Sequence, residues 1–337
     1  GLDGAVGVMA GLEVLDALDD AGVQTQRSLQ VVAWTNEEGA RFAPGLMGSQ
    51  AFVQPEALRG FAAVQDAGGL SFGQACQVAR ADFELAAQAA GWPVFEAALA
   101  QPVHAYIEAH IEQGPVLERE GLSLGIVNAI QGVRWYQVTV TGRSAHAGTT
   151  PRVDRDDAQA KAIALAHELQ GHAEQADEAL RVTIGRWAVA PDSVNTIANE
   201  VRFTLDVRHP EAAAIDAFDA CLMQALPPGS SVSRLQDKPT TAFDPGLIAQ
   251  LQAAALARGI AAKTMVSGAF HDAMPLAGHA PTAMLFAPSI RGISHHPEEN
   301  TRPADLAACT QVLADALLAL TQVTQAMPRS APQADTV

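Results

Sequence analysis

The spacing of apolar residues along the chain predicts helices and strands that alternate. Apolar residues first recur at helical spacing between Val8 and Leu18, and this run ends at an Asp-Asp-Ala-Gly turn. Continuous apolar stretches at 29–35 and 105–111 then predict two buried strands. Elements in this order indicate an α/β layer, in which functional groups usually lie at the carboxyl ends of the strands.

The middle of the chain has a different pattern. Tyr136, Val138 and Val140 alternate with polar neighbours, which predicts a strand with one buried face. The elements expected after it are a helix at about 156–169, strands near 182–189 and 201–207, a helix at about 211–226 and a short strand near Val232. The order β-α-β-β-α-β is the pattern of a ferredoxin-like α+β layer.

Helices and short strands alternate again after this layer. We expect a helix from Asp244 to about Gly259, a strand at 282–286 and a last helix that ends near Leu320. The pattern therefore predicts the α/β fold class. The expected domains are an α/β domain at 1–130 and 242–325, an inserted α+β ferredoxin-like domain at 131–241, and a frayed tail at 326–337.

The composition narrows the classes of function. Lys and Arg total 21 against 37 Asp and Glu, and the resulting formal charge of −16 repels nucleic acid and anionic membrane surfaces. With 48% hydrophobic and 17% charged residues, the chain can bury a sizeable core. We therefore expect a globular protein with no nucleic-acid or membrane partner.

The cysteines and the start of the chain bear on its location. Three cysteines at wide, unrelated spacings suit neither a disulfide framework nor a cysteine zinc site, so we expect a reducing, cytoplasmic compartment. No apolar run reaches the ~20 residues of a membrane-spanning helix. The chain starts at Gly1 without a methionine and in the middle of a motif, so we expect further sequence upstream.

Candidate metal ligands stand at the ends of the predicted elements. Glu37 and Glu38 follow the strand at 29–35, and His110 ends the strand at 105–111. Asp3 precedes the first helix, and His295 follows the strand at 282–286. Taken singly, each has an ordinary explanation: a solvated turn, a core histidine, a helix N-cap or an exposed loop.

The set as a whole points to a metal site. Zinc accepts histidine nitrogens and carboxylate oxygens, and catalytic sites keep one position open for water. A short aspartate can bridge two metals ~3.5–4 Å apart, and water bound there becomes a nucleophile at neutral pH.

The chain also carries an ordered series of motifs that spans nearly its whole length. They are Asp3–Val8, Trp34–Phe42, Glu108–Pro115, Ala145–Pro151, Phe203–Pro210, Ser267–Ala273 and Gly292–His295. Together they resemble the hydantoinase/carbamoylase family of zinc-dependent amidases, which belongs to the dinuclear-zinc aminoacylase and peptidase superfamily. The resemblance implies a zinc-peptidase-like α/β catalytic domain and an inserted lid that forms a homodimer.

The resemblance assigns roles in a dinuclear centre. It implies that Asp3 bridges two divalent ions, that Glu38, His110 and His295 are terminal ligands, and that Glu37 is the general base. Zinc is the first expectation, with manganese or cobalt as alternatives. The family's remaining ligand is a histidine upstream of the bridging aspartate, in a segment that this chain does not contain.

The resemblance also assigns residues to the substrate. His146 corresponds to an oxyanion stabiliser and Arg208 to the group that binds the substrate carboxylate. The other substrate-contacting positions are Asn195, Gln113, Ser267 and Gly268, while His271 has either a substrate contact or a role in orienting ligands.

The hypothesis that follows is an amidohydrolase that cleaves the carbamoyl group of an N-carbamoyl-L-amino acid, giving the amino acid, carbon dioxide and ammonia. Its partner is a small ureido acid. Allantoate and N-carbamoyl-β-alanine remain alternative substrates, because a carboxylate anchor and a ureido carbon serve all three. A peptidase or aminoacylase fits the Glu108–Pro115 motif less well. A catalytically inactive dimeric scaffold is the alternative from a different class.

Overall fold

The computed structural model describes residues 2–321. The described chain divides into two compact units. Unit 2 is the continuous segment Ala129–Thr241, and unit 1 comprises the described residues on either side of it. Two sheets, one centred on each unit, confirm the mixed α/β class.

A five-stranded sheet forms the centre of unit 1. Its strands run in the order β1-β9-β2-β7, and β8 pairs with β2. Their bounds are β1 (Tyr106–Ile111), β2 (Leu124–Ile130), β7 (Thr241–Ala242), β8 (Ala262–Ser267) and β9 (Thr282–Ala287). Strands β1 and β9 are parallel, with His110 opposite Phe286, so their carboxyl ends meet at one edge of the sheet. The loops that follow the two strands therefore start at the same edge of the sheet.

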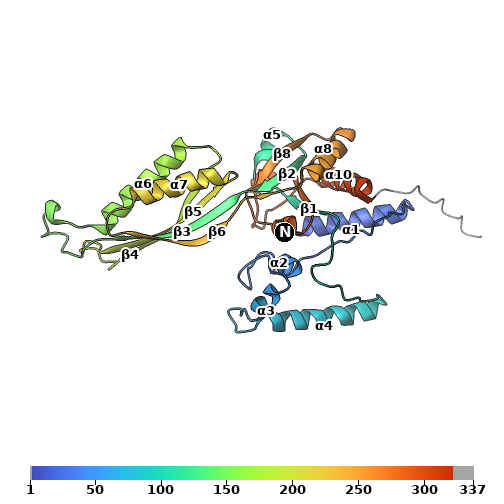
Figure 1. The fold of residues 1–337 in the computed structure, drawn as a ribbon, viewed down its shortest axis with the longest axis horizontal. Coiled ribbons are helices and arrows are strands. Elements are labelled where there is room, and N and C mark those ends of the chain that lie inside the picture. Colours follow the sequence, from blue (N-terminus) through green and yellow to red (C-terminus); the bar gives the residue numbers. More distant parts are fainter. Residues whose placement is uncertain (1, 322–337) are drawn as a thin grey trace, which may run out of the picture. The chain divides into compact units, whose positions relative to one another are not determined.

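Three helices and the sheet enclose the core of unit 1 (Figure 1). They are α1 (Ala5–Asp20), α8 (Pro245–Ala257) and α10 (Pro303–Thr321). Among residues 2–321, α10 is the one helix long and apolar enough to cross a membrane by length and composition. Its residues Cys309, Val312 and Leu313 are buried in the core of unit 1, and a core helix of a globular domain has the same length and composition.

The pattern of apolar residues missed the short helices of unit 1 and the long helix α4. Their bounds are α2 (Met47–Val53), α3 (Ala57–Ala62), α4 (Phe72–Ala90), α5 (Val116–Glu120), α9 (Ala273–Ala277) and the 3-10 turn η2 (Ile290–Gly292). Helix α4 starts at a capping box formed by Ser71 and Gln74. Only Phe72 and Ala87 of this helix are buried, so it has no continuous apolar stripe to reveal it.

The strand predicted at 29–35 is wrong. This segment is irregular and pairs with no strand among the described residues. Its side chains are half-buried or exposed rather than fully buried. They line a cavity of about 1050 Å³ in unit 1, together with α1, α10 and the approach to β1. An apolar stretch becomes a strand only where a neighbouring edge accepts its backbone hydrogen bonds.

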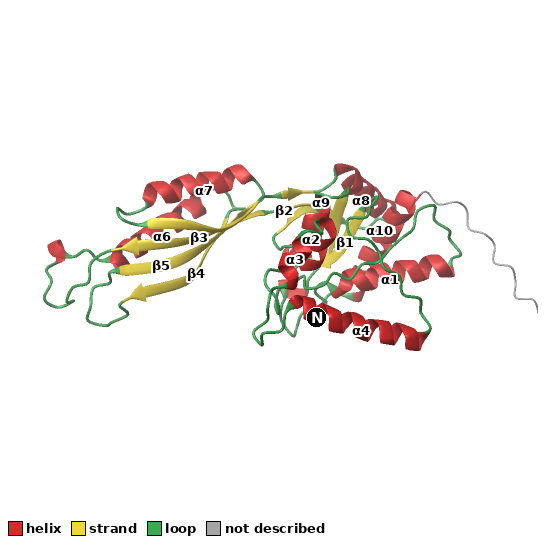
Figure 2. Cartoon of the chain, turned by 60° about the horizontal axis from the view of Figure 1, so that its bottom comes forward, coloured by secondary structure: helices red, strands yellow, loops and turns green. Residues whose placement is uncertain are grey.

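Unit 2 has the predicted order β-α-β-β-α-β. Its elements are β3 (Gly132–Thr141), the 3-10 turn η1 (Arg152–Asp154), α6 (Ala158–Gln175), β4 (Arg181–Ala190), β5 (Glu200–His209), α7 (Ala212–Ala225) and β6 (Ser231–Lys238). The strands lie in the order β4-β5-β3-β6, and each neighbouring pair is antiparallel. Both helices lie on one face of this sheet (Figures 1 and 2). This is a ferredoxin-like layer.

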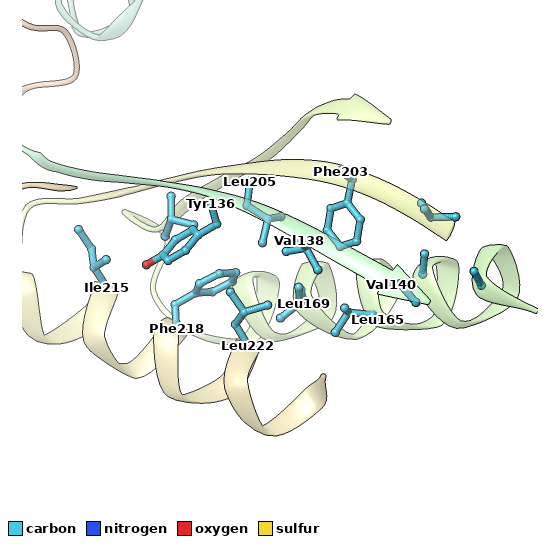
Figure 3. Close-up of a cluster of buried hydrophobic side chains, with 14 of the residues drawn as sticks. Tyr136, Val138, Val140, Leu165, Leu169, Phe203, Leu205, Ile215, Phe218 and Leu222 are labelled. Atoms are coloured by element: carbon cyan, nitrogen blue, oxygen red, sulfur yellow. The ribbon is translucent and has the colours of Figure 1, made fainter. Parts of the chain in front are cut away.

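The core of unit 2 lies between this face and the two helices (Figure 3). Alternate residues of β3 and β5 point inward, and Phe218 of α7 is fully buried against them. Tyr136 is also buried, but its hydroxyl reaches the carboxylate of Asp219. The period-two pattern of the sequence therefore marked the true inner face of both central strands. The tail predicted at 326–337 lies outside the described residues.

Candidate functional site

Asp3 lies in the turn that leads into α1, and it does not cap the helix. The N-cap residue is Gly4 at φ 68°, and no side chain caps this end. The Asp3 carboxylate instead faces two histidines. Its Oδ1 lies 3.0 Å from Nε2 of His110, and its Oδ2 lies 2.9 Å from Nε2 of His295. One imidazole nitrogen on each oxygen is the arrangement that a bridging carboxylate requires.

His110 is fixed in a state suited to metal binding. Its ring is buried, and Nδ1 lies 2.9 Å from the carbonyl oxygen of Ile111. With Nδ1 donating its proton to that carbonyl, Nε2 is the ring atom that faces Asp3, where it donates a hydrogen bond to the carboxylate and where a bound ion would take the place of that proton. The backbone N–H of Gly4 also points at Nε2, at 3.2 Å.

The charges of this cluster attract one another. Burial alone raises the pKa of Asp3, but hydrogen bonding and charge from His110, with His295 and Gln113, outweigh it and place the pKa below its usual value. Burial likewise lowers the pKa of His110, whereas its bonds to Asp3 and Ile111 raise it above its usual value. Asp3 is therefore ionised and available as a ligand at neutral pH.

Glu37 and Glu38 lie in a loop held by local backbone contacts. Asn36, at φ 56°, donates from its side-chain amide to the carbonyl oxygen of Phe42 at 2.8 Å. The loop closes over Gly45, where a Cβ atom would lie 2.4 Å from the carbonyl oxygen of Glu37. Only glycine fits this approach. Glu38 is exposed, and its Oε1 lies 3.6 Å from Nε2 of His295.

The residues present have the donor chemistry of a divalent-metal site. Ligand atoms of Asp3, Glu38 and His295 all lie within 4.8 Å of one another. His110 faces the other oxygen of Asp3. Carboxylate and imidazole donors of this kind suit zinc, manganese or cobalt. The structure thus brings together all four predicted ligands, on two sides of one carboxylate.

Glu37 has an environment that raises its pKa. Burial, followed by the charges of Asp272 and Glu38, raises the pKa of Glu37 to about 8. Asp272 accepts a hydrogen bond from Ser49 at 2.5 Å and has a pKa that burial raises to about 6. Burial also raises the pKa of the neighbouring Glu108 to about 7. A carboxylate with a pKa near neutrality is suited to accept and return a proton.

Gln113 contacts the candidate ligands directly. Its side-chain amide nitrogen lies 3.1 and 3.0 Å from the two oxygens of Asp3 and 3.2 Å from the hydroxyl of Ser294. Its Oε1 is buried and has no hydrogen-bond partner among the described residues. In this structure Gln113 therefore holds Asp3, and the sequence had suggested only a substrate contact for it.

Ser267 is the last residue of β8, and Gly268 and His271 lie in the turn that follows it. The hydroxyl of Ser267 lies 2.8 Å from Nε2 of His271. The ring of His271 is buried and meets the ring of His110 edge-on, with centroids 4.6 Å apart. Burial, and then the charge of His110, place the pKa of His271 well below its usual value. A neutral His271 in contact with His110 favours the second of its two predicted roles, that of orienting a ligand.

His146 and Asn195 lie together at one end of the unit 2 sheet. The backbone N–H of Ala147 donates to the carbonyl oxygen of Asn195 at 2.9 Å. Nδ1 of His146 accepts hydrogen bonds from the N–H groups of Gly148 at 3.0 Å and Thr149 at 3.2 Å. An accepting Nδ1 leaves the proton of the neutral ring on Nε2. The exposed ring can therefore donate one hydrogen bond.

Arg208 lies at the opposite end of β5. Residues 200 to 208 of this strand span about 27 Å at ~3.4 Å per residue, so Arg208 is far from His146 and Asn195 within unit 2. Its guanidinium binds both carboxylate oxygens of Asp206, each at 2.8 Å. The structure therefore separates the predicted residues of unit 2 into two clusters.

Sequence reasoning missed several residues of the unit 1 site. Glu299 accepts hydrogen bonds from the backbone of Asp3 and of His295, and Asp272 and Glu108 lie close to Glu37. Asp272 and Glu108 stand within recognised motifs, but Glu299 carries no signal beyond its place four residues after His295.

Comparisons with known proteins identify the family of the chain. The profile of peptidase family M20/M25/M40 matches residues 2–319. An N-carbamoyl-L-amino-acid amidohydrolase from Rhizobium meliloti is 34% identical over 96% of this chain and 77% of its own length. An allantoate amidohydrolase from Escherichia coli (strain K12) is 35% identical over 93% of this chain and 76% of its own. The crystal structure of a hydantoinase/carbamoylase family amidase from Burkholderia ambifaria has a TM-score of 0.83 and 40% identity, covering 96% of this chain and 77% of the other.

Proposed function

Because the chain belongs to peptidase family M20/M25/M40, whose profile matches residues 2–319, we propose that it is a metal-dependent amidohydrolase acting on N-carbamoyl-L-amino acids. The products are the free amino acid, carbon dioxide and ammonia. The relative from Rhizobium meliloti carries the name of this activity. Three free cysteines accord with a cytoplasmic location.

One observation carries the proposal: each oxygen of Asp3 faces one imidazole nitrogen, and Glu38 lies on one of the two sides. We assign Asp3 as the bridging ligand, His110 to one ion, and Glu38 with His295 to the other. When bound, the ions would polarise the scissile carbonyl and lower the pKa of the attacking water. Zinc is the first candidate, with manganese or cobalt as alternatives.

Glu37 would act as the general base. Its carboxylate accepts a proton from the attacking water and later delivers it to the leaving nitrogen. Burial, with the negative charges of Asp272 and Glu38, raises the pKa of Glu37, which favours its holding the proton between the two transfers. Ser49 donates a hydrogen bond to Asp272, and the negative charge of Asp272 helps to raise the pKa of Glu37.

Unit 2 would bind and polarise the substrate. His146 holds a proton on Nε2 and can donate it to the carbonyl oxygen as negative charge develops there. The planar guanidinium of Arg208 suits bidentate capture of the substrate carboxylate, and Asp206 fixes its orientation until the substrate arrives. Asn195, beside His146, would bind a polar group of the same substrate.

The separation of these clusters favours a homodimer. A small ureido acid is much shorter than the ~27 Å between the two ends of β5. His146 and Arg208 of one copy therefore cannot both contact the same molecule. We propose that a second copy of the chain supplies one of the two groups to each site.

Allantoate is the second candidate substrate, since the allantoate amidohydrolase from Escherichia coli is as similar to this chain as the carbamoylase is. Allantoate offers the same ureido carbon and carboxylate. N-Carbamoyl-β-alanine offers them too, with a longer spacing between the two groups.

The test combines metal content with turnover, using the protein expressed from its natural open reading frame. We expect bound divalent metal and ammonia release from one of three substrate groups: N-carbamoyl-L-amino acids, allantoate or N-carbamoyl-β-alanine. Glu37→Gln should lower kcat by about 10²–10⁴-fold while metal content stays the same. The matched control is Glu56→Gln, at an exposed residue, which should retain full activity. Full turnover in Glu37→Gln, or no turnover on any ureido acid by the metal-loaded protein, would reject the proposal.

A further inference from the structure

One carboxylate, that of Glu299, joins two segments of the chain that carry candidate ligands, one at Asp3 and one at His295. Glu299 Oε1 accepts hydrogen bonds from the backbone N–H groups of Leu2 at 2.6 Å and Asp3 at 3.0 Å. Its Oε2 accepts from the hydroxyl of Ser294 at 3.2 Å and from the N–H of His295 at 3.1 Å. Both oxygens are thus fully engaged, each by a different segment of the chain.

These contacts engage the backbone N–H groups just before α1 and at His295. No side chain caps α1, and Asp3 lies just before it. His295 has φ 55°, the left-handed region that a residue with a side chain adopts only when its surroundings impose it. Hydrogen bonds to an ionised carboxylate are stronger than those between neutral groups, so one Glu299 can hold both segments.

The distances that Glu299 controls are those of the candidate metal centre. The Oδ2 of Asp3 and Nε2 of His295 lie 2.9 Å apart, and the hydroxyl of Ser294 lies 3.4 Å from the same Oδ2 of Asp3. Because the two segments lie 292 positions apart in the sequence (from 3 to 295), chain connectivity does not set this separation.

We propose that Glu299 is a positioning residue of the metal centre, which fixes Asp3 and His295 at the spacing that lets them share one ion. The inference rests on the metal site of the proposed function but not on its substrate. Glu299 itself faces backbone groups and a hydroxyl, so it orients ligands without being one.

The test measures metal affinity directly, by competition of zinc or manganese with a chromophoric chelator. Glu299→Gln keeps the shape of the side chain but leaves one acceptor oxygen, so one of the two segments meets an amide NH₂ instead. We expect its dissociation constant for the metal to rise about 10–100-fold. Glu299→Asp, which keeps the charge on a shorter side chain, should give a smaller rise.

The matched control is Glu298→Gln, one residue away with the same change of charge. Glu298 is 59% exposed and pairs with Arg291 rather than with a ligand segment. We expect its metal affinity to stay within twofold of the wild type. The melting temperature of each metal-free variant is measured alongside, and metal affinities are compared only between variants that are folded at the assay temperature.

Equal metal affinity in Glu299→Gln and wild type overturns the inference, and so does an equal loss in Glu298→Gln. A wild-type protein that binds no divalent metal overturns both this inference and the proposed function. If Glu299→Gln fails to fold, Ser294→Ala removes one of its donors with less disturbance, and unchanged affinity there counts against the inference. A protein that hydrolyses no ureido acid but loses metal affinity in Glu299→Gln rejects the proposed function alone.

Discussion

Replacing His146 with alanine tests whether unit 2 takes part in the chemistry. In the structure, Nδ1 of His146 accepts from the N–H groups of Gly148 and Thr149, so the neutral ring carries its proton on Nε2. The ring is exposed and contributes nothing to the unit 2 core. The substitution therefore removes one hydrogen-bond donor and little else.

The size of the effect follows from this geometry. A single donor aimed at the developing oxyanion contributes about 2.7–4 kcal/mol, so kcat should fall about 10²–10³-fold. The KM should change little, because the uncharged carbonyl of the bound substrate gains less from the donor than the transition state does. Stability should also change little, since water can reach the two N–H groups that lose their acceptor.

The assay is ammonia release at saturating and limiting substrate, with the melting temperature of each protein as a check on folding. His167→Ala is the matched control, because His167 is an exposed histidine of α6 in the same unit. It should keep wild-type kcat. A fall of less than about threefold in His146→Ala would refute the oxyanion role, and an equal fall in both variants would refute the argument that the effect is local.

Other consequences follow from burial and hydrogen bonding. Phe218→Ala should lower the free energy of unfolding of unit 2 by about 3–5 kcal/mol in a urea titration, and Met223→Ala, at a 63% exposed site of the same helix, by less than about 0.5 kcal/mol. Burial raises the pKa of Cys309 to about 12, so a thiol reagent should modify the half-buried Cys76 in the native protein and spare Cys309; rapid labelling of Cys309 would contradict this burial. Arg208→Lys keeps the charge but loses the planar fork, so KM for an N-carbamoyl amino acid should rise about tenfold, and an unchanged KM would argue against carboxylate capture.

The fold could be predicted where the spacing of apolar residues coincides with the buried face. Tyr136, Val138 and Val140 alternate in the sequence and point into one core, so the ferredoxin-like order followed directly. The pattern failed where burial is incomplete. The 29–35 segment is apolar but unpaired, and α4 carries Phe83 at 58% exposure, so neither has the match between composition and environment on which such predictions depend.

The site was predictable as a set of residues but not as a geometry. Asp3, His110 and His295 stand at the ends of elements, and parallel pairing of β1 with β9 brings the last two to one edge. The sequence could not show which oxygen of Asp3 each histidine faces. Nor could it show Glu299, because its importance comes from backbone N–H groups, which every residue but proline has and which no motif records.

Backbone conformation at the site indicates why these supports are needed. Asn36, Gln113 and His295 all have positive φ, and each lies beside or within the candidate ligand set. Such conformations cost of order 1–3 kcal/mol each for residues with a side chain, so they persist only where surrounding contacts impose them. The contacts are those already found: Asn36 with Phe42, Gln113 with Asp3, and Glu299 with His295. These loop contacts therefore set the geometry of the candidate ligands, and such support is what holds the groups of a functional site in place.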